Sequence, residues 1–171
     1  FNEIFKSINN ALSEKGVLII EDPSLLKCLQ NLAYDQFYCE HIYVFSTLAL
    51  REVLKSFKLE IFDVENTKTH GGSNRYYIKK NTNSLYKINN RVNAEIKKEL
   101  QFGLNKFSTY QKFAKNVKIS KSKLLKIFSS LNKKKLRIIG YGATAKSCTV
   151  LNYCGLGKSD IKYFYDTTSY K

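Results

Sequence analysis

An apolar run that ends in two closely spaced glycines constrains the fold of this chain more than any other feature. The run LRIIGYGATAKS, residues 136–147, places Gly140 and Gly142 after a predicted strand and before a predicted helix. Glycines allow a sharp turn and a close approach to a phosphate, whose charge the N-terminus of a helix favours. The segment IKYFYD follows as the next strand and ends at Asp166. This order predicts a Rossmann-like α/β unit.

The same turn lacks the third glycine of a full dinucleotide-binding fingerprint. Ala145 takes its place, and Lys146 follows. Two interpretations therefore stay open. The turn contacts a nucleotide, or its glycines serve only the close packing of a strand against a helix.

The N-terminal part of the chain alternates between helix and strand patterns. We expect a helix over residues 2–12 with Gly16 at its C-cap, followed by a strand of the buried type at VLII, residues 17–20. Pro23 ends this strand because it cannot donate to a central ladder. Ser46 is a suitable N-cap for the next helix, whose apolar residues follow at helical spacing.

Two neighbouring strands come next, LEIFDVE at residues 59–65 and RYYIKK at residues 75–80, joined by a loop that contains THGGS. They predict a mixed sheet with an antiparallel edge. Residues 81–91 form a polar link. Beyond it, apolar residues at intervals of three or four predict one helix with Val92, Ile96, Leu100 and Leu104, and a second with Tyr110, Phe113, Ala114 and Val117 that ends near Leu131.

The formal charge of +15 is compatible with a nucleic-acid or membrane-surface partner. However, the basic residues are scattered, and Lys, Asn, Ile, Tyr and Phe are enriched throughout, as coding bias produces. The densest basic run, LNKKKLRIIG, leads into a strand that looks buried. We therefore expect neither nucleic acid as the main partner nor a membrane, since no apolar run approaches the ~20 residues of a membrane span.

Four cysteines occur without a CxxC pair: Cys28, Cys39, Cys148 and Cys154. Their spacing argues against a zinc knuckle or a disulfide scaffold, so no metal site is expected in these residues and a reducing cytoplasm is the expected location. The chain has no methionine and begins at Phe1, which favours a piece of a longer protein. Oligomeric state stays open.

The segment YDQFYCEHIYVFS, residues 34–46, places Tyr38, Glu40 and His41 close together between an apolar strand and a helix. Taken singly, a tyrosine such as Tyr38 is more often an ordinary core residue, and a glutamate such as Glu40 is more often a solvated surface charge. A histidine such as His41 is more often partly buried with its hydrogen bonds satisfied than a catalytic base. In THGGS, His70 stands beside two permissive glycines, where the backbone can approach a ligand or simply turn between strands.

In combination, DQFYCEHIYVFS, THGGS, the helical arm and GYGATAKSCTVLNYCGLG resemble the nucleotide-sugar C-methyltransferase family. Members use S-adenosylmethionine to methylate a ketosugar carbon. The fold class implied is α/β: the end of a class I methyltransferase (Rossmann-like) domain, a helical arm and the start of a second Rossmann-like domain. Residues 1–80 would belong to the first domain, 81–91 to a linker and 92–171 to the C-terminal domain.

The resemblance implies zinc in an N-terminal domain and a glycine-rich cofactor loop, both outside this chain, which alone should then be inactive. It places the family's Tyr-x-Glu-His cluster on Tyr38, Glu40 and His41 as catalytic residues, whereas Cys39 receives no role. The substrate, a nucleotide-linked ketosugar, would be bordered by two groups of residues: His70, Gly71, Gly72 and Ser73, and Gly140, Gly142 and Lys146.

Methylation of a carbon requires removal of a proton next to a ketone and stabilisation of the resulting oxyanion. Imidazole suits the first task because its ordinary pKa, ~6.5, is close to working pH. His41 is therefore the expected base. Glu40 would orient the imidazole or bind a sugar hydroxyl, and the Tyr38 hydroxyl would donate to the enolate oxygen, although these two roles are interchangeable at this stage.

Two other functions are compatible with the sequence. One is a non-catalytic or redox Rossmann-like module that binds a nucleotide or nucleotide sugar, in which residues 34–46 are only structural. The other is a basic protein associated with nucleic acid, such as an RNA methyltransferase, which would bind RNA with a steep dependence on salt.

Overall fold

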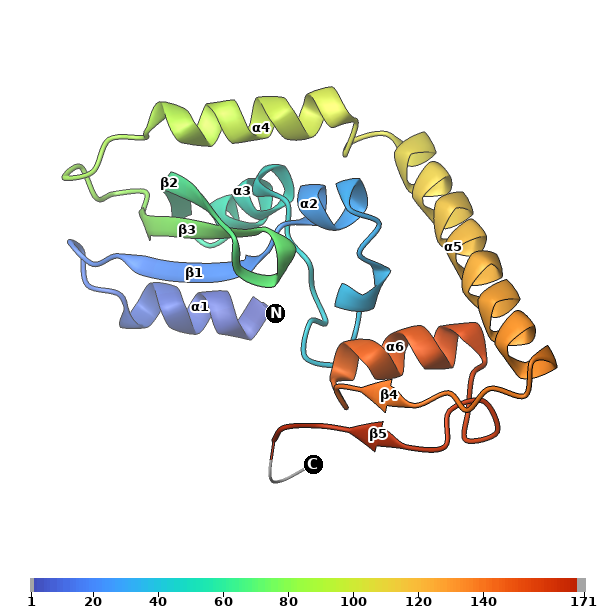
Figure 1. The fold of residues 1–171 in the computed structure, drawn as a ribbon. Helices are drawn as coiled ribbons and strands as arrows, with labels where there is room; N and C mark the ends of the chain where they lie inside the picture. The colour runs from blue at the N-terminus through green and yellow to red at the C-terminus, as the bar shows by residue number, and fades with distance from the viewer. Residues whose placement is uncertain (1, 169–171) are drawn as a thin grey trace. The chain divides into compact units, whose positions relative to one another are not determined.

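The computed structural model describes residues 2–168, which form two compact units (Figure 1). Unit 1 contains the described residues up to Asn31 together with Tyr43–Thr109. Unit 2 contains Leu32–Ile42 and the described residues from Tyr110 onward. Both units combine helices with strands, and the predicted α/β class is confirmed.

Unit 1 consists of a small sheet with four helices and most of the loops between them. Its elements in chain order are α1 (Asn2–Ala11), β1 (Leu18–Pro23), α2 (Leu25–Gln30), α3 (Thr47–Lys55), β2 (Leu59–Thr67), the single 3-10 turn η2 (Thr69–Gly71), β3 (Ser73–Lys80) and α4 (Asn90–Phe102).

The three strands of unit 1 lie in the order β1, β3, β2 (Figure 1). Both pairings are antiparallel, with Tyr76 of β3 opposite Ile20 on one side and Val64 on the other. The antiparallel pairing predicted for the strands at residues 59–65 and 75–80 is therefore confirmed, whereas the mixed sheet is wrong for the strands of this unit. The strand β3 lies between β1 and β2. The strands β1 and β2 run in the same direction, but they are not hydrogen-bonded to each other because β3 separates them.

The strand β1 is less buried than its sequence suggests. Its side chains alternate in burial, and Ile19 is 56% exposed. Since successive side chains of a strand point to opposite faces, one face of β1 is open to solvent, and the prediction of a buried strand is wrong. The strand does end at Pro23, as predicted.

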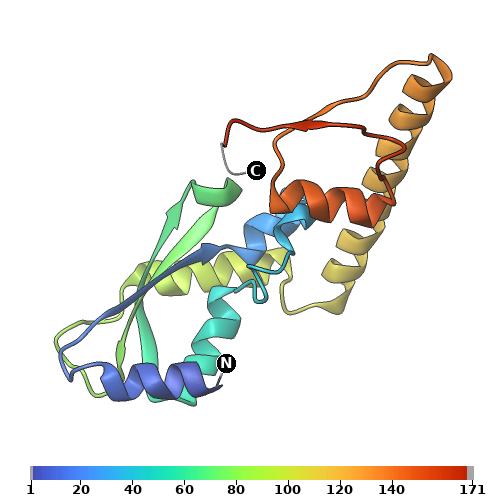
Figure 2. The ribbon, with the colours of Figure 1, turned by 90° about the horizontal axis from the view of Figure 1, so that it is seen from below.

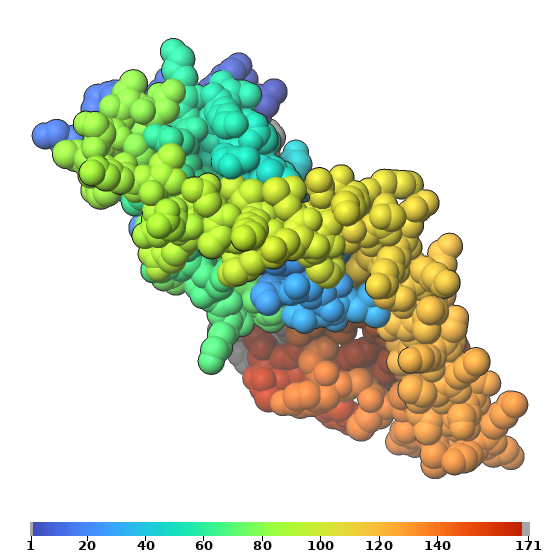
Figure 3. All heavy atoms as spheres, turned by 90° about the horizontal axis from the view of Figure 1, so that it is seen from above, coloured from blue at the N-terminus to red at the C-terminus, as the bar shows by residue number. Residues whose placement is uncertain are grey.

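The core of unit 1 forms where helices pack on the sheet, with α3 and α4 both against β2 (Figure 2). In the space-filling view, α4 follows the surface of this unit for its whole length (Figure 3). The buried cluster combines residues of α1, α3, α4, β2 and β3: Phe5, Leu50, Leu54, Leu59, Ile61, Val64, Tyr76, Ile78, Val92 and Ile96.

The helix ends of unit 1 follow local signals in part. Ser46 caps α3 as predicted, since its hydroxyl accepts a hydrogen bond from the backbone N–H of Ala49. Gly16 is not a C-cap. The helix α1 ends earlier, and the Gly16 N–H donates to the carbonyl of Ser13 in a separate turn.

Unit 2 contains the 3-10 turn η1 (Tyr34–Gln36), most of α5 (Phe107–Lys133), β4 (Gly140–Tyr141), α6 (Ala145–Cys154) and β5 (Phe164–Tyr165). The predicted order of strand, glycine turn, helix and strand is confirmed, and β4 and β5 are parallel. Both strands are only two residues long. Leu136 and Ile139 are about half exposed, at 53% and 55%, so the buried strand expected there is not formed.

Within residues 2–168, no helix has the length and apolar character that crossing a membrane would require.

Candidate functional site

The segment with Tyr38, Glu40 and His41 connects α2 to α3 and follows the turn η1. The sequence placed it directly after a strand, which is wrong, because α2 stands between β1 and this segment. This helix begins just after Pro23 and buries Leu26, Cys28 and Leu29. The predicted residues therefore lie on a loop between two helices.

Within this loop, the structure brings Tyr38 and His41 together. Their rings meet edge to face, with 4.8 Å between centroids and 86° between planes. The backbone N–H of His41 also donates to the carbonyl oxygen of Tyr38 over 2.9 Å. One turn of backbone thus holds a phenol next to an imidazole.

The environment of the Tyr38 phenol keeps it protonated. Burial raises its pKa above the ordinary value, and the nearby charge of Glu40 adds to the rise. A protonated phenol is a hydrogen-bond donor. Glu40 itself is exposed, and His41 is partly buried. A donor beside an imidazole is suited to move a proton while stabilising a developing oxyanion.

The THGGS segment forms the tight turn between β2 and β3. His70 has φ 53°, Gly71 has φ 83° and Gly72 has φ 129°, so three consecutive residues have positive φ. A side chain at Gly72 would also come within 2.7 Å of the Lys27 side chain. This geometry accounts for the glycines through the turn alone, and His70 is exposed at its tip.

The end of this turn is tied to its surroundings. The Ser73 hydroxyl is buried and donates to the carbonyl of Thr69 over 2.9 Å, so it points away from solvent. The carbonyl of Gly72 accepts from the Ser24 N–H, and that of Gly71 accepts from the Asn31 amide. Of the four predicted residues here, His70 presents its side chain most openly.

The Gly140–Lys146 turn has a different organisation from a phosphate-binding loop. A methyl group at Gly140 would lie 2.2 Å from the Phe164 ring, so this glycine permits the close pairing of β4 with β5. Gly142 has φ 89°, which favours glycine. Thr144 and Ser147 then cap α6 reciprocally.

The carboxylate of Asp166 is tied to this turn by a hydrogen bond. The Asp166 side chain accepts hydrogen bonds from the N–H groups of Ala143, over 2.7 Å, and Thr168, over 2.8 Å. A second anion at the Ala143 N–H would meet like charge, which disfavours binding. Close packing of β4 against β5 accounts for Gly140, and contact of this turn with a nucleotide stays a prediction. Lys146, partly buried in α6, stays a predicted contact.

Sequence reasoning missed Glu99 of α4. This residue is fully buried, and its carboxylate accepts from the backbone N–H groups of Thr47 and Leu48 at the start of α3. The predicted apolar stripe named Leu100 instead, which is 39% exposed. The spacing of Glu99 could have indicated its burial, because it lies three residues after the buried Ile96 and therefore on the same face of the helix.

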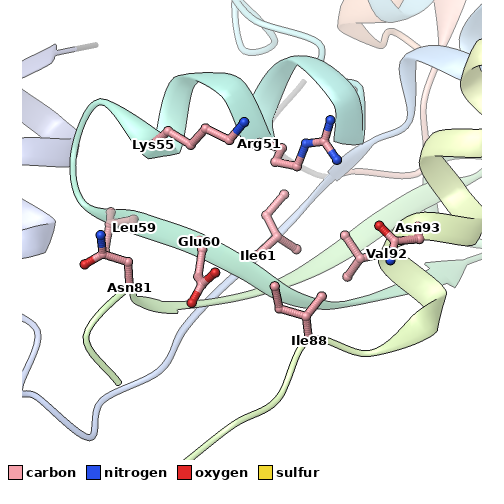
Figure 4. A pocket seen from close by; sticks show the side chains of 9 residues that line it. All are labelled: Arg51, Lys55, Leu59, Glu60, Ile61, Asn81, Ile88, Val92 and Asn93. Carbon is pink, nitrogen blue, oxygen red and sulfur yellow. The ribbon is translucent and has the colours of Figure 1, made fainter. Parts of the chain in front are cut away.

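A cavity of about 380 Å³ opens in unit 1 beside β2 and the start of α4 (Figure 4). Arg51 and Lys55 reach over it from α3, and Ile61, Ile88 and Val92 give it an apolar wall. None of the predicted site residues lines this cavity.

None of the four cysteines, all within the described residues, forms a disulfide: Cys28 and Cys154 are buried, and Cys39 and Cys148 are exposed. In the described part of the chain, no three His, Cys, Asp or Glu side chains form a group that could hold a metal ion.

Comparison with known proteins gives two matches. Residues 68–171 match the family model described as the C-methyltransferase C-terminal domain. The C-methyltransferase NovU of Streptomyces niveus is 26% identical over 170 residues, a region that covers 99% of this chain. The chain spans about 40% of the length of that relative.

Proposed function

This chain belongs to the family that carries the C-methyltransferase C-terminal domain, and we propose that its protein transfers a methyl group from S-adenosylmethionine to a carbon of a nucleotide-linked ketosugar. The cofactor, when bound, supplies a methyl group attached to a positively charged sulfonium sulfur. That sulfur leaves as a neutral thioether, so the protein need not provide an acid to protonate it. We assign no cofactor contact to the Gly140–Gly142 turn, which the proposal places beside the nucleotide of the substrate. The activity is proposed for the whole protein, since the chain spans 40% of its relative.

In this proposal, His41 removes the proton next to the sugar ketone. The C–H bond would break, with its proton going to the imidazole and its electron pair forming the enolate. The enolate carbon would then bond to the methyl group as the methyl–sulfur bond breaks and its electron pair stays on the sulfur, leaving a neutral thioether. A positioned base is needed because such a proton is only weakly acidic in water.

Tyr38 would stabilise the enolate oxygen by donating its hydroxyl hydrogen. The raised pKa of this phenol keeps the donor in place through the reaction, and its contact with the His41 ring places donor and base on one short turn. This juxtaposition is the observation that carries the proposal. Glu40, exposed beside them, is free to bind a sugar hydroxyl, which favours that role over orienting the imidazole.

The turn with His70, Gly71, Gly72 and Ser73 would border the sugar or its diphosphate mainly through His70, whose side chain is the exposed one. Contacts from Gly140, Gly142 and Lys146 to the nucleotide are the weaker part of the proposal, because Asp166 lies at that turn.

The test is methyl transfer from labelled S-adenosylmethionine to a panel of nucleotide-linked 4-ketosugars, catalysed by the whole protein. The proposal predicts label on a sugar carbon. Normal cofactor binding with no transfer to any sugar would contradict it. Tight NAD binding without any response to S-adenosylmethionine would favour the alternative of a nucleotide-binding module.

A further inference from the structure

Four polar side chains form a connected network in the interior of unit 1. The Glu99 carboxylate accepts from the backbone N–H of Thr47 over 2.7 Å and from that of Leu48 over 2.8 Å. The Asn74 amide reaches the Thr47 hydroxyl at 3.5 Å and the Tyr76 hydroxyl at 3.2 Å. None of these side chains has more than a trace of solvent exposure.

Helix capping accounts for Glu99, whose carboxylate satisfies two N–H groups at the start of α3, but it does not account for the contact of Thr47 with Asn74. Burial of polar groups is unfavourable unless all are paired, and well-packed apolar residues would serve a core at least as well. Burial also raises the pKa of the Glu99 carboxyl, which is the mark of desolvation. What such a network provides is a unique arrangement of the elements that it connects.

The network connects the start of α3 with the strand end that bears the His70 turn, one of the segments to which the proposed function assigns the substrate. Thr47 starts α3, six residues after His41 along the chain. Asn74 follows the Thr69–Ser73 turn directly and lies second in β3. Glu99 belongs to neither segment and joins them from α4, 52 residues beyond Thr47.

We propose that Glu99 is a positioning residue, which through Thr47 and Asn74 holds the start of α3 in register with the strand end that bears the His70 turn. The effect of Glu99 on turnover rests on the proposed function. The hydrogen-bonded connection between the start of α3 and the His70 turn does not. Misplacement of substrate-contacting groups by about 1 Å is sufficient to lower turnover by up to about 10²-fold.

Thr47→Val separates the link from simple helix capping. Valine keeps the backbone N–H that Glu99 accepts from, and it removes the hydroxyl through which Thr47 contacts Asn74. In the whole protein, we expect the amides of residues 69–76 to exchange with solvent about tenfold faster or more, and methyl transfer to fall about tenfold. Thr47→Ser, which restores a hydroxyl, should recover both.

Glu99→Gln tests the other end of the network, with Glu95→Gln as its matched control. Glu95 lies one turn earlier on α4 and is also buried, but its carboxylate pairs with Lys98. We expect Glu99→Gln to speed exchange at residues 46–48 and at 69–76 together, with the fold retained by circular dichroism, and Glu95→Gln to leave both segments near wild type.

Exchange confined to residues 46–48 in Glu99→Gln, or unchanged exchange at 69–76 in Thr47→Val, would overturn the link. Turnover within twofold of wild type in Thr47→Val, despite faster exchange, would overturn the positioning role. A wild-type protein that transfers no methyl group would instead refute the proposed function, and the exchange rates would still decide whether the network couples the segments.

Discussion

The ring of Tyr38 and the ring of His41 meet edge to face, 4.8 Å apart between centroids. Phenylalanine can make the same ring contact without a hydroxyl, so Tyr38→Phe separates packing from hydrogen-bond donation. We predict that this variant loses about 10²-fold in turnover, as expected for a lost oxyanion donor, with its thermal unfolding midpoint unchanged. Methyl-transfer kinetics and calorimetry on the same preparation measure both quantities.

Tyr43→Phe is the control for that experiment. Tyr43 is 52% exposed, and its ring stacks on Phe45. This variant should turn over like wild type. Full activity in Tyr38→Phe would show that the Tyr38 hydroxyl does not act on the reacting sugar.

Gly140→Ala should destabilise unit 2 through a steric clash. The added methyl carbon would lie 2.2 Å from the Phe164 ring, so the ring or the strand must shift. We predict a loss of about 1–3 kcal/mol in the free energy of unfolding, as for other overpacked sites. Gly157→Ala is the matched control, because a methyl group there meets open space. Equal stability of the two variants, measured by denaturant unfolding, would contradict the close pairing of β4 with β5.

Glu99 should give the protein a measurable dependence of stability on pH. Burial raises the pKa of its carboxyl above the value of 4.5 that it has when unfolded. The folded state therefore binds this proton more tightly, and the stabilisation that results is complete below the unfolded pKa and disappears as pH rises through the folded pKa. Relative to Glu99→Gln, wild type should thus lose unfolding free energy as pH rises from about 4.5, until it levels off.

Urea unfolding of wild type and Glu99→Gln at a series of pH values measures this difference. Glu95 and Tyr76 are the titratable neighbours of Glu99, and both are kept in the variant. A difference between the two proteins that is constant across the pH range would contradict a raised pKa.

The elements predicted correctly are those with local signals. Ser46 and the apolar spacing of Leu50 and Leu54 predict α3, because the N-cap residue and the helical spacing both lie within one short segment of the sequence. By contrast, α2 has only six residues, too few to show a period. The insertion of β3 beside β1 depends on pairings between distant residues, such as Ile20 with Tyr76, which no local pattern specifies.

The same distinction applies to the site. Tyr38 and His41 are three positions apart, so a single turn brings them together and the sequence is sufficient to group them. Glu99 and Thr47 are 52 residues apart, and their contact exists only because α4 packs on α3. The contact of Asp166 with the Ala143 N–H likewise depends on the pairing of β4 with β5, which no local pattern specifies.

Methyl transfer by His41→Ala is the measurement that tests the central claim most directly. The whole protein and this variant would be supplied with labelled S-adenosylmethionine and the ketosugar that wild type accepts, with cofactor affinity measured in parallel. The account predicts a loss of about 10²-fold or more in transfer with unchanged cofactor binding, as for removal of a general base. Near-normal transfer by His41→Ala would show that another group removes the proton.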